Sequence, residues 1–364
     1  MEPPSSKSVS AMSQGCKTSD KTWTVTHNKC TTRPSDIAWH ANRHILVSHT
    51  TGTLQLFEFG NSYDDRLRCC IVVASRAFRQ PLSERRIEGG ARALASSSCC
   101  TALLSATAPN SLVLLPSGML DGEEVVVALP ERLSCLQLAD ELAIVGARAG
   151  LHLVDLITDT AFAHIPIRGP SRPDLDLTLF TGGAARMRSL GGCFLAVEGV
   201  SSSVIQLCDV RVPDAIVASI DSASKRESAF VLRLPAAFDD RSFVVFAGLT
   251  PFDTSPADGH LAVCLPAIGQ IALYDTRSRR QVVQRPYGAG EPTDVALAEH
   301  GQLFVCTNDS VYWMDLKKDV DPVLIADELA QPRHPRVSTT TKPALAFLSE
   351  DAWHVAERHN HQKS

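Results

Sequence analysis

The chain has 364 residues, of which 44% are hydrophobic and 21% are charged, a balance typical of one large globular domain or two ordinary ones. An apolar run of about 18 residues, the length that a transmembrane helix needs, does not occur in it. The net charge of −5 excludes a strongly basic nucleic-acid-binding protein, although it does not exclude a local basic face.

Residues 1–33 are rich in Ser, Thr and Lys and poor in apolar residues, so we expect a mostly disordered N-terminal tail. Trp23 and Val25 are the candidates within it for the start of a strand. The tail lacks the apolar segment of a secretion signal. The 11 cysteines include the adjacent pairs Cys69-Cys70 and Cys99-Cys100 but no regular disulfide spacing. Together these features predict reduced thiols in an intracellular protein.

Alternation of apolar and polar residues predicts a series of strand pairs joined by tight turns. In the first unit, His44–Ser48 leads through Thr51-Gly52 to Thr53–Phe59. Three further units follow, over Ala91–Ser117, Glu131–Thr158 and Ala185–Val210. The second of these units closes with Leu153-Val154-Asp155, a large residue followed by Asp, and the third closes with Gln206-Leu207-Cys208-Asp209.

The stretch from Asp258 to Lys318 contains two more units of the same kind. His260–Leu265 leads to Gln270–Asp275, and Gln302–Thr307 leads to Ser310–Asp315, each again ending in a bulky residue and Asp. Such a unit, repeated after about 40 residues, is typical of a blade of a WD-type β-propeller. The sequence therefore predicts an all-β fold, a single WD-type β-propeller of six or seven blades.

The predicted domain organisation has three parts: the tail at 1–33, the propeller at 34–330 and a C-terminal tail at 331–364. No strand–turn–strand–Asp unit follows Asp315. Either an N-terminal strand closes the ring, or a blade is missing and the ring is incomplete.

Four segments, in the same order, resemble the WD-repeat assembly factors of the large ribosomal subunit, of the Nop-seven-associated protein one type. The resemblance covers about residues 185–318. The segments are Arg186-Met187-Arg188 before a strand ending in Leu207-Cys208-Asp209; Leu232-Arg233-Leu234-Pro235 followed by Asp239-Asp240; Gln270–Asp275 with the basic turn Arg277-Ser278-Arg279-Arg280; and Pro286-Tyr287-Gly288 followed by Glu291-Pro292. The chain departs from the family between Lys318 and Pro343, where the family's final blade is missing, and it lacks the family's Lys-rich tail.

The resemblance implies a non-catalytic scaffold in the nucleus, within the nucleolus, that acts in ribosome biogenesis and rRNA processing of the large (60S) subunit precursor. Its implied partners are ribosome assembly factors, an AAA-type ATPase and pre-ribosomal RNA, with no membrane and no small-molecule substrate. The alternative is a WD-repeat adaptor in another complex, such as a ubiquitin-ligase receptor or a trafficking scaffold.

Catalytic signatures are missing from the sequence: it has no G-x-S-x-G elbow, no P-loop and no H-E-x-x-H. The closing Asp residues are expected to accept hydrogen bonds from the turn that follows each strand. His354, His359 and His361 are expected to lie in a solvated tail rather than to hold a metal. We therefore expect no enzyme activity, no metal and no cofactor.

Basic residues of the second half are the candidates for binding RNA or an acidic partner. If blades four to six are neighbours, these residues form one patch able to meet phosphates, and Tyr287 offers a stacking surface for an unpaired base. The competing interpretation pairs the arginines with Asp239, Asp240, Glu291 or Asp294 and places Tyr287 in a packed turn. The candidate residues are Arg186, Arg188, Arg233, Arg277, Arg279, Arg280, Arg285 and Tyr287.

Overall fold

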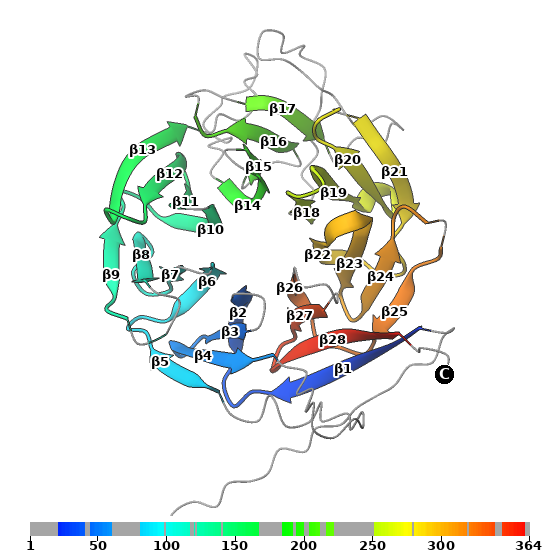
Figure 1. Ribbon diagram of the computed structural model, residues 1–364, viewed down its shortest axis with the longest axis horizontal. Coiled ribbons are helices and arrows are strands. Elements are labelled where there is room, and N and C mark those ends of the chain that lie inside the picture. The colour runs from blue at the N-terminus through cyan, green and yellow to red at the C-terminus, as the bar shows by residue number, and fades with distance from the viewer. Residues whose placement is uncertain are drawn as a thin grey trace, which may run out of the picture.

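The computed structural model describes residues 21–360, except 41–43, 60–80, 98–99, 117–119, 121, 140, 167–183, 192–193, 200–203, 212–215, 222–250, 279, 319 and 339–343. Seven four-stranded antiparallel sheets stand around a central channel, and each sheet is one blade of a propeller (Figure 1). In blades 1 to 6 the strands follow chain order from the channel to the rim.

The strands of the first three blades cover residues 34–166. Blade 1 contains β2 (Pro34–His40), β3 (His44–His49), β4 (Thr53–Glu58) and β5 (Ser83–Arg86); blade 2 contains β6 (Ala91–Ser96), β7 (Cys100–Ser105), β8 (Ser111–Pro116) and β9 (Val125–Ala128); blade 3 contains β10 (Leu133–Ala139), β11 (Leu142–Ala147), β12 (Gly150–Asp155) and β13 (Thr160–Pro166).

The next three blades cover residues 184–326. Blade 4 contains β14 (Ala184–Gly191), β15 (Phe194–Gly199), β16 (Val204–Asp209) and β17 (Ile216–Asp221); blade 5 contains β18 (Phe252–Ser255), β19 (His260–Leu265), β20 (Gln270–Asp275) and β21 (Arg280–Pro286); blade 6 contains β22 (Pro292–Leu297), β23 (Gln302–Thr307), β24 (Val311–Asp315) and β25 (Val323–Ala326). Two short 3₁₀ turns, Pro266–Ile268 and Glu299–Gly301, join strands of these blades.

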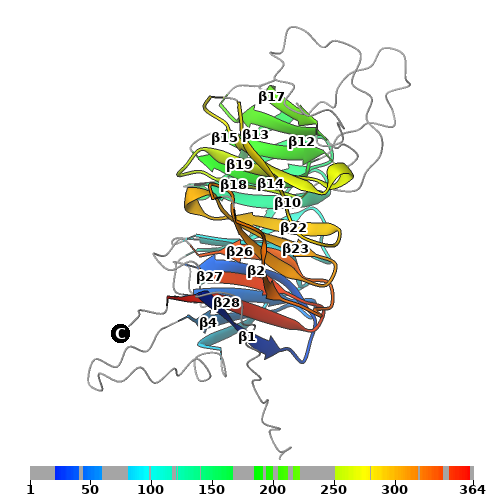
Figure 2. The ribbon, with the colours of Figure 1, turned by 90° about the vertical axis from the view of Figure 1, so that its right-hand side faces the viewer.

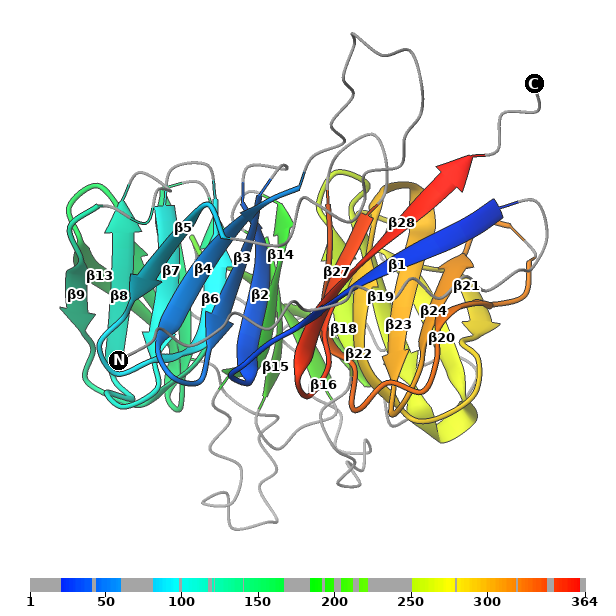
Figure 3. The same cartoon turned by 90° about the horizontal axis from the view of Figure 1, so that it is seen from below.

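Blade 7 joins the two ends of the chain. It contains β26 (Arg333–Val337), β27 (Ala344–Leu348), β28 (Ala352–Asn360) and, as its outermost strand, β1 (Lys21–Lys29). β1 and β28 run antiparallel along their full lengths (Figure 2, Figure 3). Closure in this way leaves no open end between the first and last blades, so no long sheet edge is exposed there.

One expectation about the chain ends is wrong: residues 333–360 form a blade rather than a C-terminal tail. Trp23 and Val25, the strand candidates within residues 1–33, do lie in a strand, β1. Of the two alternatives for the ring, closure by an N-terminal strand is confirmed. Blade 7 does not show the strand–turn–strand–Asp pattern in the sequence, because its fourth strand comes from the other end of the chain and because β28 does not end in Asp. His354, expected in a solvated tail, is buried in this blade.

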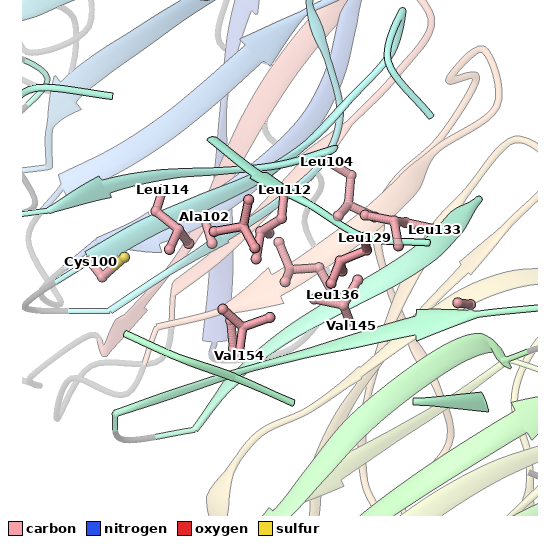
Figure 4. Close-up of a cluster of buried hydrophobic side chains, with 13 residues drawn as sticks. Cys100, Ala102, Leu104, Leu112, Leu114, Leu129, Leu133, Leu136, Val145 and Val154 are labelled. Atoms are coloured by element: carbon pink, nitrogen blue, oxygen red, sulfur yellow. The ribbon is translucent and has the colours of Figure 1, made fainter. Parts of the chain in front are cut away.

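The core lies between neighbouring blades. In the cluster shared by blades 2 and 3, Leu112 and Leu114 of β8 face Leu136 of β10 and Val154 of β12 (Figure 4). Cys100 belongs to the same cluster as a small buried residue, whereas Cys69, Cys70 and Cys99 lie outside the described residues. Each fully buried Leu or Val contributes about 1.5–3 kcal/mol, so stability is distributed around the ring.

The closing Asp residues have the predicted structural role. The Oδ1 atom of Asp155 accepts the backbone N–H of Ile157 at 2.7 Å, and that of Asp275 accepts the N–H of Arg277 at 2.8 Å. Asp209 and Asp315 accept the N–H two residues on in the same way. These contacts fix the turn between the third and fourth strands of a blade.

Within the described residues, no helix has the length and apolar character that a membrane crossing requires.

Candidate functional site

The structure divides the predicted basic residues between two places. Arg186 and Arg188 lie on β14, the innermost strand of blade 4, whereas Arg280 and Arg285 lie on β21, the outermost strand of blade 5 (Figure 1). A single patch that unites both groups is therefore not formed. Arg233 and Arg279 lie outside the described residues.

The two arginines at the channel are held in ion pairs. Arg186 Nη1 lies 3.1 Å from Asp294 Oδ1, which confirms the predicted pairing with Asp294. Arg188 Nε lies 2.9 Å from Asp253 Oδ1, a partner that the sequence did not suggest. Desolvation is the largest single influence and lowers the pKa of Arg188, but the carboxylates of Asp253, Asp294 and Asp36 together outweigh it and raise this pKa above its usual value. The Arg188 guanidinium thus stays charged, and the two ion pairs serve first to hold blades 4, 5 and 6 together.

The residues at the rim of blade 5 differ in their access to solvent. Arg277 and Arg280 are exposed and Arg285 is partly exposed. Tyr287 is only 4% exposed and belongs to the hydrophobic cluster between blades 5 and 6. Desolvation raises the pKa of its hydroxyl. The packed-turn interpretation of Tyr287 is therefore confirmed, and its ring is not available to stack on a base.

A repeated contact links the inner strands of neighbouring blades. Asp36 Oδ2 accepts the backbone N–H of Leu94 in the next blade at 2.8 Å. Asp253 Oδ2 likewise accepts the N–H of Leu297 at 2.8 Å, and Asp294 Oδ2 accepts that of His334 at 3.2 Å. In each case a carboxylate on the first strand of one blade reaches the first strand of the next.

Three carboxylates and three guanidinium groups therefore share the wall of the channel. Arg336 Nη2 lies 3.7 Å from Asp36 Oδ1, which adds a third cation beside Arg186 and Arg188. Desolvation raises the pKa of Asp294, but Arg186, Arg188, His334 and Arg336 together outweigh it and hold this pKa below its usual range. Charges buried this deeply are tolerated only when they are paired and hydrogen-bonded.

A cavity of about 670 Å³ lies where the inner strands of all seven blades end. Its wall combines the charged side chains of Arg188, Asp253 and Arg336 with hydroxyl and amide groups such as Ser96 and Gln137. The loop residues Pro256, Ala257, Glu299 and His300 border the cavity where β18 and β22 end. Such a mixed wall can hydrogen-bond and orient a polar segment of a partner.

A serine–histidine contact borders this cavity. His40 Nδ1 lies 2.8 Å from Ser96 Oγ, and Ser96 Oγ lies 3.1 Å from Thr101 Oγ1. Desolvation, and the neighbouring His44, lower the pKa of His40. In a catalytic triad a carboxylate orients the histidine. Among the described residues, no carboxylate does so for the His40 ring. The contact between His40 and Ser96 joins the ends of β2 and β6. In the same way, Trp39 Nε1 donates a hydrogen bond to the carbonyl of Arg336 and joins blades 1 and 7.

Comparison with known proteins gives a match at the level of structure alone. No protein-family model matches the chain, and no curated protein matches it. The WD40 domain of Pan2 from Neurospora crassa superposes with a TM-score of 0.59 at 12% sequence identity, over 91% of this chain and 90% of that one. The fold is that of a WD40-type propeller.

In all, 1224 chains of solved structures match this chain. The likeness at 12% identity shows the fold and says nothing of the partner, because one fold carries many functions.

Proposed function

We propose that this chain is a non-catalytic scaffold that binds protein partners on the faces of its propeller. The observation that carries the proposal is the closed ring of seven four-stranded blades with a polar cavity at the channel. A closed ring is rigid, and its connecting loops present several surfaces at fixed positions. The buried ion pairs of the channel wall support the same role, since they fasten blades to one another.

More narrowly, we propose that the scaffold acts in the nucleolus on the precursor of the large ribosomal subunit. This proposal is supported by the four collinear segments that resemble the assembly factors of that subunit. The proposed partners are ribosome assembly factors, an AAA-type ATPase and pre-ribosomal RNA.

Arg277, Arg280 and Arg285 are the candidates for phosphate contact in this proposal. They lie at the end of β20 and along β21, on the outer edge of blade 5. The side chains of Arg277 and Arg280 are exposed, as contact with a phosphate backbone requires. Arg186 and Arg188 are proposed to act indirectly, by holding the blades that carry this edge.

Affinity purification of the tagged chain, followed by mass spectrometry, RNA sequencing and sedimentation, tests the proposal. We expect enrichment of large-subunit precursors and co-sedimentation with them. Arg280→Glu is expected to reduce cross-linking to RNA, whereas Arg86→Glu, an exposed arginine on the outermost strand of blade 1, is the matched control. Recovery of a ubiquitin-ligase adaptor or a trafficking complex instead would favour the alternative. Sedimentation only as a free monomer contradicts both the narrow proposal and the alternative.

A further inference from the structure

Three side chains of the kinds that bind metals converge on blade 3. Glu131 lies in the connection between β9 and β10, His152 on β12 and His164 on β13. The register of the sheet places His152 directly opposite His164. Because directly opposed residues on antiparallel strands have Cβ atoms about 4.5–5.5 Å apart, the two imidazoles lie on the same face of the blade.

The three side chains present their ligand atoms to a common point. His152 Nε2 lies 2.9 Å from Glu131 Oε1, and His164 Nε2 lies 3.9 Å from the same oxygen. One ligand atom from each residue lies within 4.8 Å of the others. A tetrahedral ion bound at about 2.0–2.2 Å needs ligand atoms about 3.4 Å apart, so small side-chain rotations suffice to bind one ion.

The carboxylate is oriented by a further contact. Glu131 Oε2 accepts the backbone N–H of Ala149 at 2.8 Å, in the turn between β11 and β12. This bond holds the second oxygen and leaves Oε1 directed at the two imidazoles. Outer contacts of this kind orient metal ligands in known sites and are part of their affinity.

The surroundings give an ion both access and room for one more ligand. His152 is buried, whereas the His164 side chain is 40% exposed. The three residues line a hollow of about 430 Å³ whose other walls are largely apolar, and Phe162 at its edge is 58% exposed. Sites with three protein ligands and an open position bind a water or an external donor, unlike closed structural sites with four protein ligands.

We propose that Glu131, His152 and His164 bind one divalent transition-metal ion of the zinc class, with water in the open position. Two imidazoles and one carboxylate suit Zn²⁺ and its substitutes Co²⁺ and Ni²⁺ better than Ca²⁺ or Mg²⁺, which prefer oxygen ligands. The bound ion would tie the connection between blades 2 and 3 to the outer strands of blade 3. This site is separate from the channel and independent of the proposed scaffold role.

Equilibrium dialysis of the full chain against Zn²⁺, with metal quantified by mass spectrometry, tests the proposal. We expect one ion per chain. His164→Ala is the main variant, since this exposed side chain on an outermost strand can be removed without opening the core. It should weaken binding by at least about 100-fold, because loss of even an outer-shell partner weakens metal sites about 10–100-fold. Glu131→Gln, which keeps the shape but removes the charge, should weaken it too.

The control variant is His359→Ala/His361→Ala, which removes the closely spaced histidines near the C-terminus. Its Zn²⁺ affinity should equal that of the unaltered chain. Replacement of Zn²⁺ by Co²⁺ adds a spectroscopic readout, a visible absorption band that should vanish in His164→Ala while the circular dichroism of the fold is retained. The proposal is overturned if the unaltered chain binds no ion, if His164→Ala binds as tightly, or if only the C-terminal variant loses binding.

Discussion

At the scale of single residues, the channel carboxylates determine how blades are joined. Asp294 is 5% exposed and accepts three contacts at once, from Arg186, from the N–H of Val295 and from the N–H of His334. The last of these crosses to blade 7. Asp36 and Asp253 make equivalent contacts to their next blades. A charged group in such a position stabilises the ring only while all its partners are present.

Asp294→Asn should therefore destabilise the protein strongly. The substitution leaves the Arg186 guanidinium, whose side chain is 16% exposed, without its counter-charge, and breaking one side of a buried ion pair costs about 3–5 kcal/mol. Urea unfolding measures the change in the free energy of unfolding. Asp351→Asn is the control, because the pair that Asp351 forms with Lys29 has side chains 57% and 66% exposed and should change stability by less than about 1 kcal/mol. Equal effects of the two substitutions would contradict the buried network.

His354 should make stability fall in acid. Its Nε2 lies 2.9 Å from Ser349 Oγ and its Nδ1 lies 3.1 Å from His27 Nδ1, deep in blade 7. Desolvation, with a contribution from His27, lowers its pKa from 6.5 to about 3. Between pH 6.5 and about 3, His354 is protonated in the unfolded chain but neutral in the folded chain. The contribution of His354 to the free energy of unfolding is therefore complete above pH 6.5 and is lost as the pH falls toward 3. The loss is about 1.4 kcal/mol per pH unit.

Unfolding free energies measured from pH 7 to pH 4 check the contribution of His354. His354→Gln should lower the stability at pH 7 but reduce its dependence on pH by about one proton, since the amide cannot titrate. His300→Gln, which alters a histidine whose side chain is 79% exposed, is the control variant. An unchanged slope in His354→Gln would show that another group causes the acid sensitivity.

At the scale of elements, periodicity predicted strands well and blades less well. The predicted strands Gln270–Asp275 and Gln302–Thr307 have the bounds of β20 and β23, because alternation and turn residues are local signals. Blade 7 was missed because the pairing of β1 with β28 joins residues more than 300 positions apart. The outermost strands were mostly missed too, since short exposed strands such as β5 and β9 have weak patterns.

The candidate sites could be predicted only in part from the sequence. The sequence identified the arginines as candidates because several occur in its second half. Whether each one faces the channel or the rim depends on the place of its strand in a blade. Likewise, Glu131 and the two histidines of blade 3 become neighbours only through the strand register and the path of a connecting loop. The one sequence signal available was a pair of histidines on either side of a predicted turn, and it gains meaning only once the register is known.

Close packing between blades 3 and 4 depends on a glycine within a strand. Gly146 lies on β11, and a Cβ atom there would approach the Ala184 Cβ of β14 to 2.8 Å and would also contact Cys135 Sγ. Gly146→Ala should therefore destabilise the protein by about 1–3 kcal/mol through overpacking. Thermal and urea unfolding measure it. The double variant Gly146→Ala/Ala184→Gly should recover part of the loss, and absence of any recovery would contradict this packing.

At the scale of the whole molecule, one strand decides whether the ring is closed. β1 pairs with β28 from Lys21↔Asn360 to Lys29↔Ala352. It also carries Trp23, whose ring centroid lies 5.6 Å from that of Phe304 and 6.1 Å from that of Trp313 in blade 6. The same strand thus completes one blade and seals it against the previous one. Removing it exposes both a sheet edge and an apolar surface.

A chain that begins at residue 31 should accordingly aggregate or unfold at much lower denaturant concentration than the full chain. The milder variant Trp23→Ala keeps the strand and should cost about 3–5 kcal/mol, as expected for removal of a buried aromatic side chain. A chain that begins at residue 21 keeps β1 and is the matched control. A synthetic peptide of residues 20–30 should restore the stability of the shortened chain, because an exposed edge accepts an added strand. If the chain without β1 were as stable as the control, the ring would not depend on this closure.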